Sequence, residues 1–276
     1  MTSLNSFLRG VVDLTLLPFR LAPSWVSLTL YALVLAVLAL LVYKRCSNQP
    51  AIEAAKRRMA ASIFEIRLFN DDLRAILRAQ GSLLRDNMRY LGLNLVPLVV
   101  MVALMLPLFA HLQFVYGYEG MPVGKPAVIT VALAEGAAPD TAPPEVELSA
   151  PDGVRIEAGP VWIQPRRELS WRLVGDEPGR YELALDLEGR ETTKSLVVDS
   201  GLTRRSPVRQ RSGFWNQLLY PAEDPLPSDL GLESIRLDYP ERDVSLLGIE
   251  MHWSIAVLIL SLVIALLLRK RFGVTF

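Results

Sequence analysis

The sequence predicts a membrane protein with three transmembrane helices, a cytoplasmic helical hairpin and an inserted extracytoplasmic all-β sandwich. Two observations carry this prediction. Three apolar runs are long enough to cross a bilayer, whose hydrocarbon core takes about 20 apolar residues. A long segment between the second and third runs alternates apolar and polar residues instead, which is typical of strands. The 276 residues are 51% hydrophobic, with a mean hydropathy of +0.29, which favours a membrane protein over soluble domains.

Three spans are expected at residues 21–43, 91–116 and 251–268, because none of these runs contains a charged residue. At 1.5 Å per residue they give roughly 27 to 39 Å of helix. A signal peptide is the alternative for the first run, but that run is too long and no small-residue cleavage site follows it. Aromatic residues near the run ends suit the bilayer interface: Trp25, Tyr43, Tyr90, Tyr116, Trp253 and Phe272.

The charged residues are divided unevenly, although the formal net charge is zero. Residues 44–90 carry ten Lys and Arg against five Asp and Glu, and residues 269–271 are all basic. Residues 115–251 carry fourteen basic and twenty-three acidic residues. Short segments rich in Lys and Arg stay in the cytoplasm. We therefore expect the 44–90 loop and the basic tail 269–276 inside a prokaryotic plasma membrane, with the N-terminus and residues 117–250 outside.

Residues 1–20 are expected to form an amphipathic helix lying on the outer leaflet. Asn5, Arg9 and Asp13 fall on one side of this helix. The apolar side comprises Leu4, Phe7, Leu8, Val11, Val12 and Thr15.

Residues 44–90 predict a basic antiparallel hairpin with about 20 residues per arm. Pro50 suits the start of the first helix, after the cap-forming Ser47 and Asn48. Asn70-Asp71-Asp72 interrupts the apolar pattern and supplies a cap for the second helix, which runs into the second span. Two interpretations stay open, a solvated hairpin and a docking surface for lipid head groups, the ribosome or an acidic nascent chain. The arginines expected on the outer faces are Arg57, Arg58, Arg67, Arg74, Arg78 and Arg85.

Residues 117–250 predict the β-sandwich, followed by a C-terminal strap. Asp176, Gly179 and Tyr181 resemble the corner that precedes a late strand in immunoglobulin domains, and Trp171 suits the core. The basic and aromatic run at 204–220 is expected to be a strap packed on the sandwich, with a membrane-surface wedge as the alternative. Seven strands are expected at 127–133, 145–149, 154–157, 161–164, 168–174, 180–187 and 192–198, with a further strand at 232–239.

The sequence gives no positive sign of enzyme chemistry. Nucleotide-binding loops, nucleophile elbows and metalloprotease motifs are absent from it. Cys46 is the single cysteine, and the two histidines, His111 and His252, fall near span ends, where partners in water or backbone are expected rather than a metal. We therefore expect a protein that is not an enzyme and uses neither metal nor cofactor.

Polar residues inside the spans have two interpretations. Ser24, Ser27 and Tyr31 share one face of the first span, Asn94 lies one turn inside the second, and Ser261 lies in the third. Ordinary hydrogen bonds between helices are the simpler interpretation, at about 0.6 kcal/mol per contact. The alternative is a partly hydrated groove between the three helices.

The order of these parts resembles the YidC/Oxa-type insertase superfamily. The nearest parallel is its three-span branch, which contains the ER membrane complex insertase subunit, the Get-pathway receptor subunit and the TMCO-type proteins. The stretches that carry the resemblance are Ser47-Asn48-Gln49 through Lys56-Arg57-Arg58-Met59, Arg67-Leu68-Phe69-Asn70-Asp71-Asp72 and Asn87-Met88-Arg89-Tyr90, followed by the second span. They lie in residues 1–118, which together with 249–276 make up the half of the chain that resembles the family.

The resemblance implies an insertase that moves hydrophobic segments into the bilayer without nucleotide hydrolysis. The hairpin would receive nascent membrane protein segments, which then pass through a hydrophilic groove. By position, Lys44, Arg45, Arg89 and Asn94 would line the mouth of this groove, and Ser27, Tyr31 and Ser261 its deeper wall.

The sequence departs from the family in two ways. The first span has no internal charge, and the β-domain has no counterpart at its position. An alternative function is therefore a membrane-anchored structural or receptor protein whose β-domain binds an envelope partner.

Overall fold

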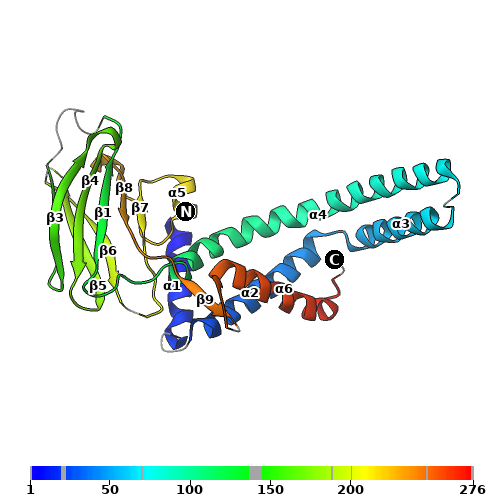
Figure 1. Ribbon diagram of the computed structural model, residues 1–276, viewed down its shortest axis with the longest axis horizontal. Helices are drawn as coiled ribbons and strands as arrows, with labels where there is room; N and C mark the ends of the chain where they lie inside the picture. The colour runs from blue at the N-terminus through cyan, green and yellow to red at the C-terminus, as the bar shows by residue number, and fades with distance from the viewer. Residues whose placement is uncertain are drawn as a thin grey trace. The chain divides into compact units, whose positions relative to one another are not determined.

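The computed structural model describes residues 2–19, 23–69, 71–136, 145–187, 189–199, 201–246 and 248–274. The chain divides into a first unit, Met1–Leu28 with Pro107–Ala256, and a second unit, Thr29–Leu106 with Val257–Phe276. The first unit contains the strands, and the second contains the helical hairpin (Figure 1).

Three helices in the described residues are long and apolar enough to cross a membrane: α2 (Ser24–Cys46), α4 (Leu73–Tyr116) and α6 (Trp253–Phe272). Each contributes residues to both units. The three predicted apolar helices are therefore confirmed, although their ends differ from the prediction. The first two predicted residues of the first span, Leu21 and Ala22, lie outside the described residues.

The third predicted span began two residues too early. Met251 and His252 belong to strand β10 (Ile249–His252), which pairs with β9 (Asp243–Leu246) in an antiparallel hairpin. The apolar run continues through Met251, so composition alone does not separate the strand from the helix that begins at Trp253.

The predicted hairpin is present in the second unit as α3 (Gln49–Leu68) and the first half of α4. Asn48 caps α3 by accepting a hydrogen bond from the Ala51 amide at 3.1 Å. Asp72 caps α4, because its Oδ1 accepts from the amides of Arg74 and Ala75 at 2.8 and 3.2 Å. Asn70, also expected at this turn, lies outside the described residues.

Apart from the β9–β10 hairpin, the strands of the first unit form two antiparallel sheets around one core, which together make up the β-region. The larger sheet has the order β3-β4-β1-β8-β7, and the smaller one has the order β2-β5-β6. Side chains of both sheets, including Ile129, Leu173, Leu183 and Leu196, are fully buried together. The strand bounds are β1 (Pro126–Leu133), β2 (Val146–Ser149), β3 (Val154–Ile163), β4 (Glu168–Gly175), β5 (Gly179–Leu187), β6 (Arg190–Val198), β7 (Val208–Gln210) and β8 (Leu232–Leu237).

Two predicted strands, 154–157 and 161–164, are one continuous strand, β3. The prediction broke the strand at Gly159-Pro160, but β3 is the edge of its sheet, where a proline without an N–H costs no ladder hydrogen bond. The register against β4 shifts on both sides of Ala158 instead. Strands β7, β9 and β10 and the short helix α5 (Phe214–Leu219) were not predicted.

Tyr181 lies near the start of β5 and fixes the turn that precedes it. Its hydroxyl donates to the Glu177 carbonyl at 3.0 Å. Gly153 lies against this ring with φ +92°, and a Cβ there would come within 2.7 Å of the hydroxyl. Trp171 is 4% exposed, which confirms its expected place in the core.

Candidate functional site

All six predicted arginines of the hairpin are exposed in the second unit. Arg58 pairs with Asp86 of the other arm at 2.8 Å, and Arg57 lies 3.9 Å from Glu53. Within the described residues, no carboxylate lies within 4.0 Å of the remaining four. The hairpin therefore carries basic charge that its own acids do not neutralise.

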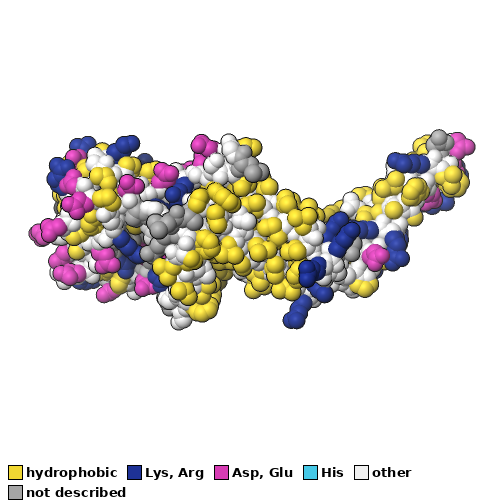
Figure 2. Space-filling model, turned by 90° about the horizontal axis from the view of Figure 1, so that it is seen from below, with side chains coloured by type: hydrophobic (Ala, Val, Ile, Leu, Met, Phe, Trp, Pro, Cys, Tyr) yellow, Lys and Arg dark blue, Asp and Glu magenta, His cyan; other side chains and the backbone are white. Residues whose placement is uncertain are grey.

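The hairpin also exposes large apolar side chains, which the sequence did not predict. Where the two arms meet, the buried side chains are small, namely Ala55, Ser62 and Ala79, whereas the buried Ile52 packs with Leu40 and Tyr43 of α2. Eight larger ones are 44% to 74% exposed: Ile63, Phe64, Leu68, Phe69, Leu73, Leu77, Leu84 and Met88. Figure 2 shows apolar and basic side chains next to each other over this part of the chain.

The way the two arms meet explains this exposure. Midway along the hairpin, the hydroxyl groups of Ser62 and Ser82 form a hydrogen bond at 2.9 Å. Two helices in contact cover only one narrow stripe on each other. Since serine and alanine occupy that stripe, the larger apolar residues remain outside it. Phe64, Leu68 and Phe69 line an open hollow near the end of α3, together with Ala61, Glu65 and Arg67.

Asn94 and Tyr43 form a polar contact between α4 and α2 in the second unit. The Tyr43 hydroxyl donates to Asn94 Oδ1, and Asn94 Nδ2 donates to the Tyr90 carbonyl at 2.7 Å. Because Lys44 and Arg45 directly follow Tyr43 and Arg89 precedes Tyr90, the four predicted mouth residues lie where the hairpin joins the apolar parts of α2 and α4. Lys44, Arg45 and Arg89 are exposed and Asn94 is half-buried. Tyr43 was predicted only as an interface aromatic residue.

The three predicted wall residues belong to different units. Tyr31 is buried in the second unit, and Ser261 donates to the Leu258 carbonyl of its own helix at 3.0 Å. Ser27 belongs to the first unit, where it is fully buried and accepts a hydrogen bond from Tyr116 at 2.7 Å. Ser27 and Ser261 thus make ordinary helix contacts, and the hydrated groove stays a prediction.

The ends of the three apolar helices meet in the first unit. Besides the contact between Ser27 and Tyr116, Trp253 donates to Gln113 at 2.7 Å, and its ring packs 5.5 Å from Phe109. His252 contacts the Ser254 hydroxyl at 2.7 Å, whereas His111 is 2% exposed and its ring nitrogens have no partner among the described residues. No group of three or more metal-binding side chains occurs in the part of the chain that the structure describes.

A buried ion pair fastens the segment just after the strap to β6. Lys194 is fully buried and donates to Glu223 at 2.5 Å, while Glu223 also accepts from the Ser195 amide and the Ser206 hydroxyl at 2.7 and 2.6 Å. Burial lowers the pKa of Lys194, although Glu223 opposes this shift. Burial alone would raise the pKa of Glu223, but Lys194 and the two hydrogen bonds hold it below its usual range.

The sequence analysis missed this ion pair. The available signal was a lysine in phase with the inward-facing Leu196 and Val198 of β6.

Comparisons with known proteins assign no family to the chain. No protein-family model matches the chain, and no curated protein matches it. Domains 4 and 5 of the S-layer protein SbsC are similar over 30% of this chain at 13% identity, with a TM-score of 0.23. The aligned part covers 47% of that solved structure, about half its length.

Proposed function

We propose that the protein is a membrane protein insertase or chaperone. It receives hydrophobic segments on the hairpin, on the cytoplasmic side of a prokaryotic plasma membrane, and passes them into the bilayer without nucleotide hydrolysis. The observation that carries the proposal is the row of exposed apolar side chains on the hairpin, flanked by exposed arginines.

The position of these side chains supports a role in binding protein segments rather than lipid tails. The arm of α4 from Leu73 to the start of the apolar run at Leu91 is about 27 Å long. We therefore infer that Leu68 and Leu73 lie outside the apolar run, in water. Exposed apolar patches in water mark binding sites, because covering them releases about 25 cal/mol per Å². Met88, with its flexible side chain, suits a surface that accepts varied sequences.

The polar residues next to the hairpin support a path toward the bilayer. Asn94 lies inside an apolar run, where an amide without a partner is unfavourable. Its contacts with Tyr43 and the Tyr90 carbonyl are hydrogen bonds that a polar flank of a client could replace. Lys44, Arg45 and Arg89 add exposed positive charge beside this pair, which suits acidic flanks.

We propose further that the β-region is an immunoglobulin-like sandwich on the outer side of the membrane. Its strand order supports this, since β3-β4-β1 and β2-β5-β6 follow the order of the D-E-B and C-F-G sheets. Strand β8 lies beside β1, in the place of the first immunoglobulin strand. The tyrosine corner at Tyr181 and the acidic surplus of residues 115–251 agree with this assignment.

Site-specific photo-crosslinking to nascent membrane proteins tests the insertase proposal. A probe at Leu68 on the hairpin and one at Asn94 are expected to give client adducts. The control is a probe at Leu41, an exposed residue within the apolar part of α2. Adducts at Leu68 and Asn94 that do not exceed those at Leu41 would refute the proposal and favour a membrane-anchored receptor.

A further inference from the structure

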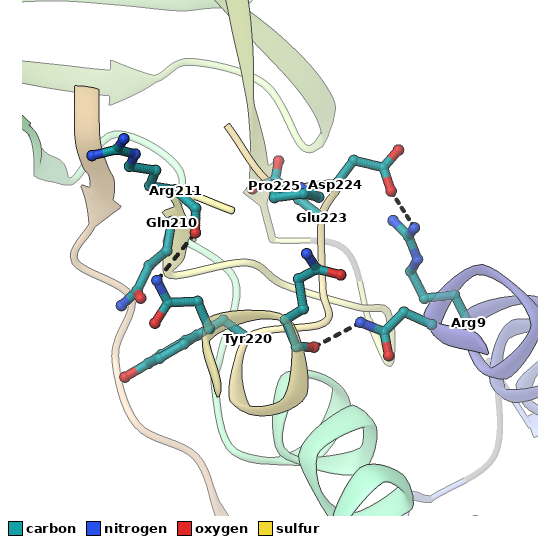
Figure 3. Close-up of a pocket in the computed structure, with 10 residues that line it drawn as sticks. Arg9, Gln210, Arg211, Tyr220, Glu223, Asp224 and Pro225 are labelled. Atoms are coloured by element: carbon teal, nitrogen blue, oxygen red, sulfur yellow. Dashed lines mark hydrogen bonds and ion pairs between the residues drawn. The ribbon is translucent and has the colours of Figure 1, made fainter. Parts of the chain in front are cut away.

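Helix α1 (Thr2–Leu16) packs onto the rest of the first unit through its polar side. Asn5 is 8% exposed and donates to the Gln217 carbonyl of α5 at 2.6 Å. Arg9 pairs with Asp224, and Arg204 donates to Asp13 at 2.8 Å. Figure 3 shows Arg9 reaching from α1 to Asp224 just after the strap. Val12, expected on the apolar side, is buried with these polar residues.

The apolar side of α1 faces outward instead. Its exposed residues, spaced three or four apart along one face, are Leu4, Phe7, Val11, Leu14 and Leu17, the last in the 3-10 turn that follows (Leu17–Phe19). They are 40% to 68% exposed. A surface helix in water shows the opposite arrangement, with its apolar stripe turned toward the core. This helix is therefore built to meet an apolar surrounding.

Helix α5 repeats the arrangement next to α1. Phe214, Trp215 and Leu219 are 58%, 65% and 46% exposed. Tyr220, just after the helix, turns inward, with its ring 6.4 Å from Phe114. The contact of Asn5 with Gln217 places α5 beside the N-terminal part of α1, as Figure 1 also shows. The two exposed apolar sets thus belong to neighbouring elements of one unit.

These elements lie in the unit where the three apolar helices end. The contacts of Tyr116 with Ser27 and of Trp253 with Gln113 mark these ends. The exposed apolar side chains of α1 and α5 lie beside these helix ends, and therefore near the bilayer interface. Tryptophan and phenylalanine are favoured at that interface. Arg211 is exposed three residues before Phe214, which suits a lipid phosphate.

We propose that α1 and α5 form one lipid-docking platform, and that its occupant is the phospholipid bilayer around the protein. Phe214 and Trp215 insert into the interface, while the polar contacts of α1 hold the β-region in a fixed orientation above it. This proposal takes up the alternative of a membrane-surface wedge for part of residues 204–220. Arg204 and Arg205 are buried as a packed strap requires, but α5 is not. The platform does not rest on the insertase function and would serve a receptor equally well.

Spin labels on the full chain in phospholipid nanodiscs test this proposal. Since Cys46 is the single cysteine, a Cys46→Ser background allows one label at a time. Labels are placed by Trp215→Cys and Phe7→Cys. The matched control is Val161→Cys on β3, whose side chain is 58% exposed. Oxygen, which concentrates in lipid, is expected to relax the first two labels more than a water-soluble nickel chelate does, and the order is reversed at 161.

A label at 215 that relaxes like the one at 161 would overturn the proposal. Because lipid is the only other component of the nanodiscs, that result would mean that lipid does not cover this surface. The exposed positions of all three labels keep folding intact, which the unchanged unfolding temperature of each variant checks. Replacing neutral phosphatidylcholine with anionic phosphatidylglycerol is expected to move the label at 215 deeper into the lipid. Arg211→Gln is expected to remove that change in depth. A shift that survives Arg211→Gln would refute the phosphate contact.

Discussion

The β-region and the hairpin treat their large apolar residues in opposite ways. Ile129, Leu173 and Leu183 are fully buried between the two sheets, whereas Phe64 and Leu68 of the hairpin are 67% and 74% exposed. Two sheets facing each other close a complete layer of side chains, but two helices cover only one stripe each. Apolar residues in the β-region therefore stabilise the fold. Those of the hairpin add little to stability and are available for binding.

The largest effect is expected in the core of the β-region. Trp171→Ala should lower the free energy of unfolding by about 3–5 kcal/mol, because the cavity left by the ring cannot close fully. Thermal unfolding of the full chain in detergent, followed by circular dichroism, measures it. Val161→Ala, on the exposed side of β3, should change stability by less than about 0.5 kcal/mol. Equal losses in both variants would contradict the assignment of the core.

The next largest effect concerns the buried ion pair between Lys194 and Glu223. Lys194→Met leaves the carboxylate of Glu223 without its cation and should cost about 3 kcal/mol or more. The double variant with Glu223→Met should recover part of this loss, since no unpaired charge remains. If the double variant is less stable than Lys194→Met, the ion pair is not the source of the effect.

Acid should weaken the same contact. The pKa of Glu223 is held below its usual value in the folded protein, while in the unfolded chain a glutamate titrates near 4.3. The stabilisation is therefore complete above about pH 4.3 and is lost as the pH falls through the lower folded value. Denaturant unfolding between pH 3 and 6 should show this decline, and Glu223→Gln should make it shallower. If the free energy of unfolding depends on pH identically in the wild type and in Glu223→Gln, Glu223 is not the source of the decline.

Neutralising the hairpin should have the smallest effect on stability. The combination of Arg74→Gln, Arg78→Gln and Arg85→Gln should change unfolding by less than about 0.5 kcal/mol, because these side chains are exposed. Binding of anionic vesicles to the protein in nanodiscs should weaken by about 1 kcal/mol per arginine and depend less on salt. Unchanged vesicle binding would show that these arginines are solvated and do not bind lipid head groups.

The sequence predicted those elements whose signal is local. Apolar runs specify the three long helices, helical spacing with Asn48 and Asp72 as caps specifies the hairpin, and alternation specifies most strands. Strand β7 and the β9–β10 hairpin are short, and their pairing depends on partners far along the chain or on a boundary hidden within an apolar run. Periodicity does not reveal them.

The candidate site was predictable only in part. The exposure of the arginines follows from their charge. The exposure of Phe64 and Leu68 does not, because an apolar stripe in a sequence looks the same whether or not another element covers it. The amphipathic character of α1 was predicted, but its polar contacts with Gln217 and Asp224 were not, because these partners lie far away in the sequence. The sequence also did not identify Tyr43 as the hydrogen-bond partner of Asn94, since several residues near the ends of the first span were possible partners.

Insertion by the purified protein tests the central claim most directly. The full chain is reconstituted into proteoliposomes, and a short client with one apolar segment is assayed by protection of its tail from protease. Phe64→Ser combined with Leu68→Ser should lower the protected fraction severalfold, with unchanged unfolding. Val161→Ser, a matched loss of exposed apolar surface outside the hairpin, should leave it unchanged. Equal protection by the wild type and the hairpin variant would contradict the account.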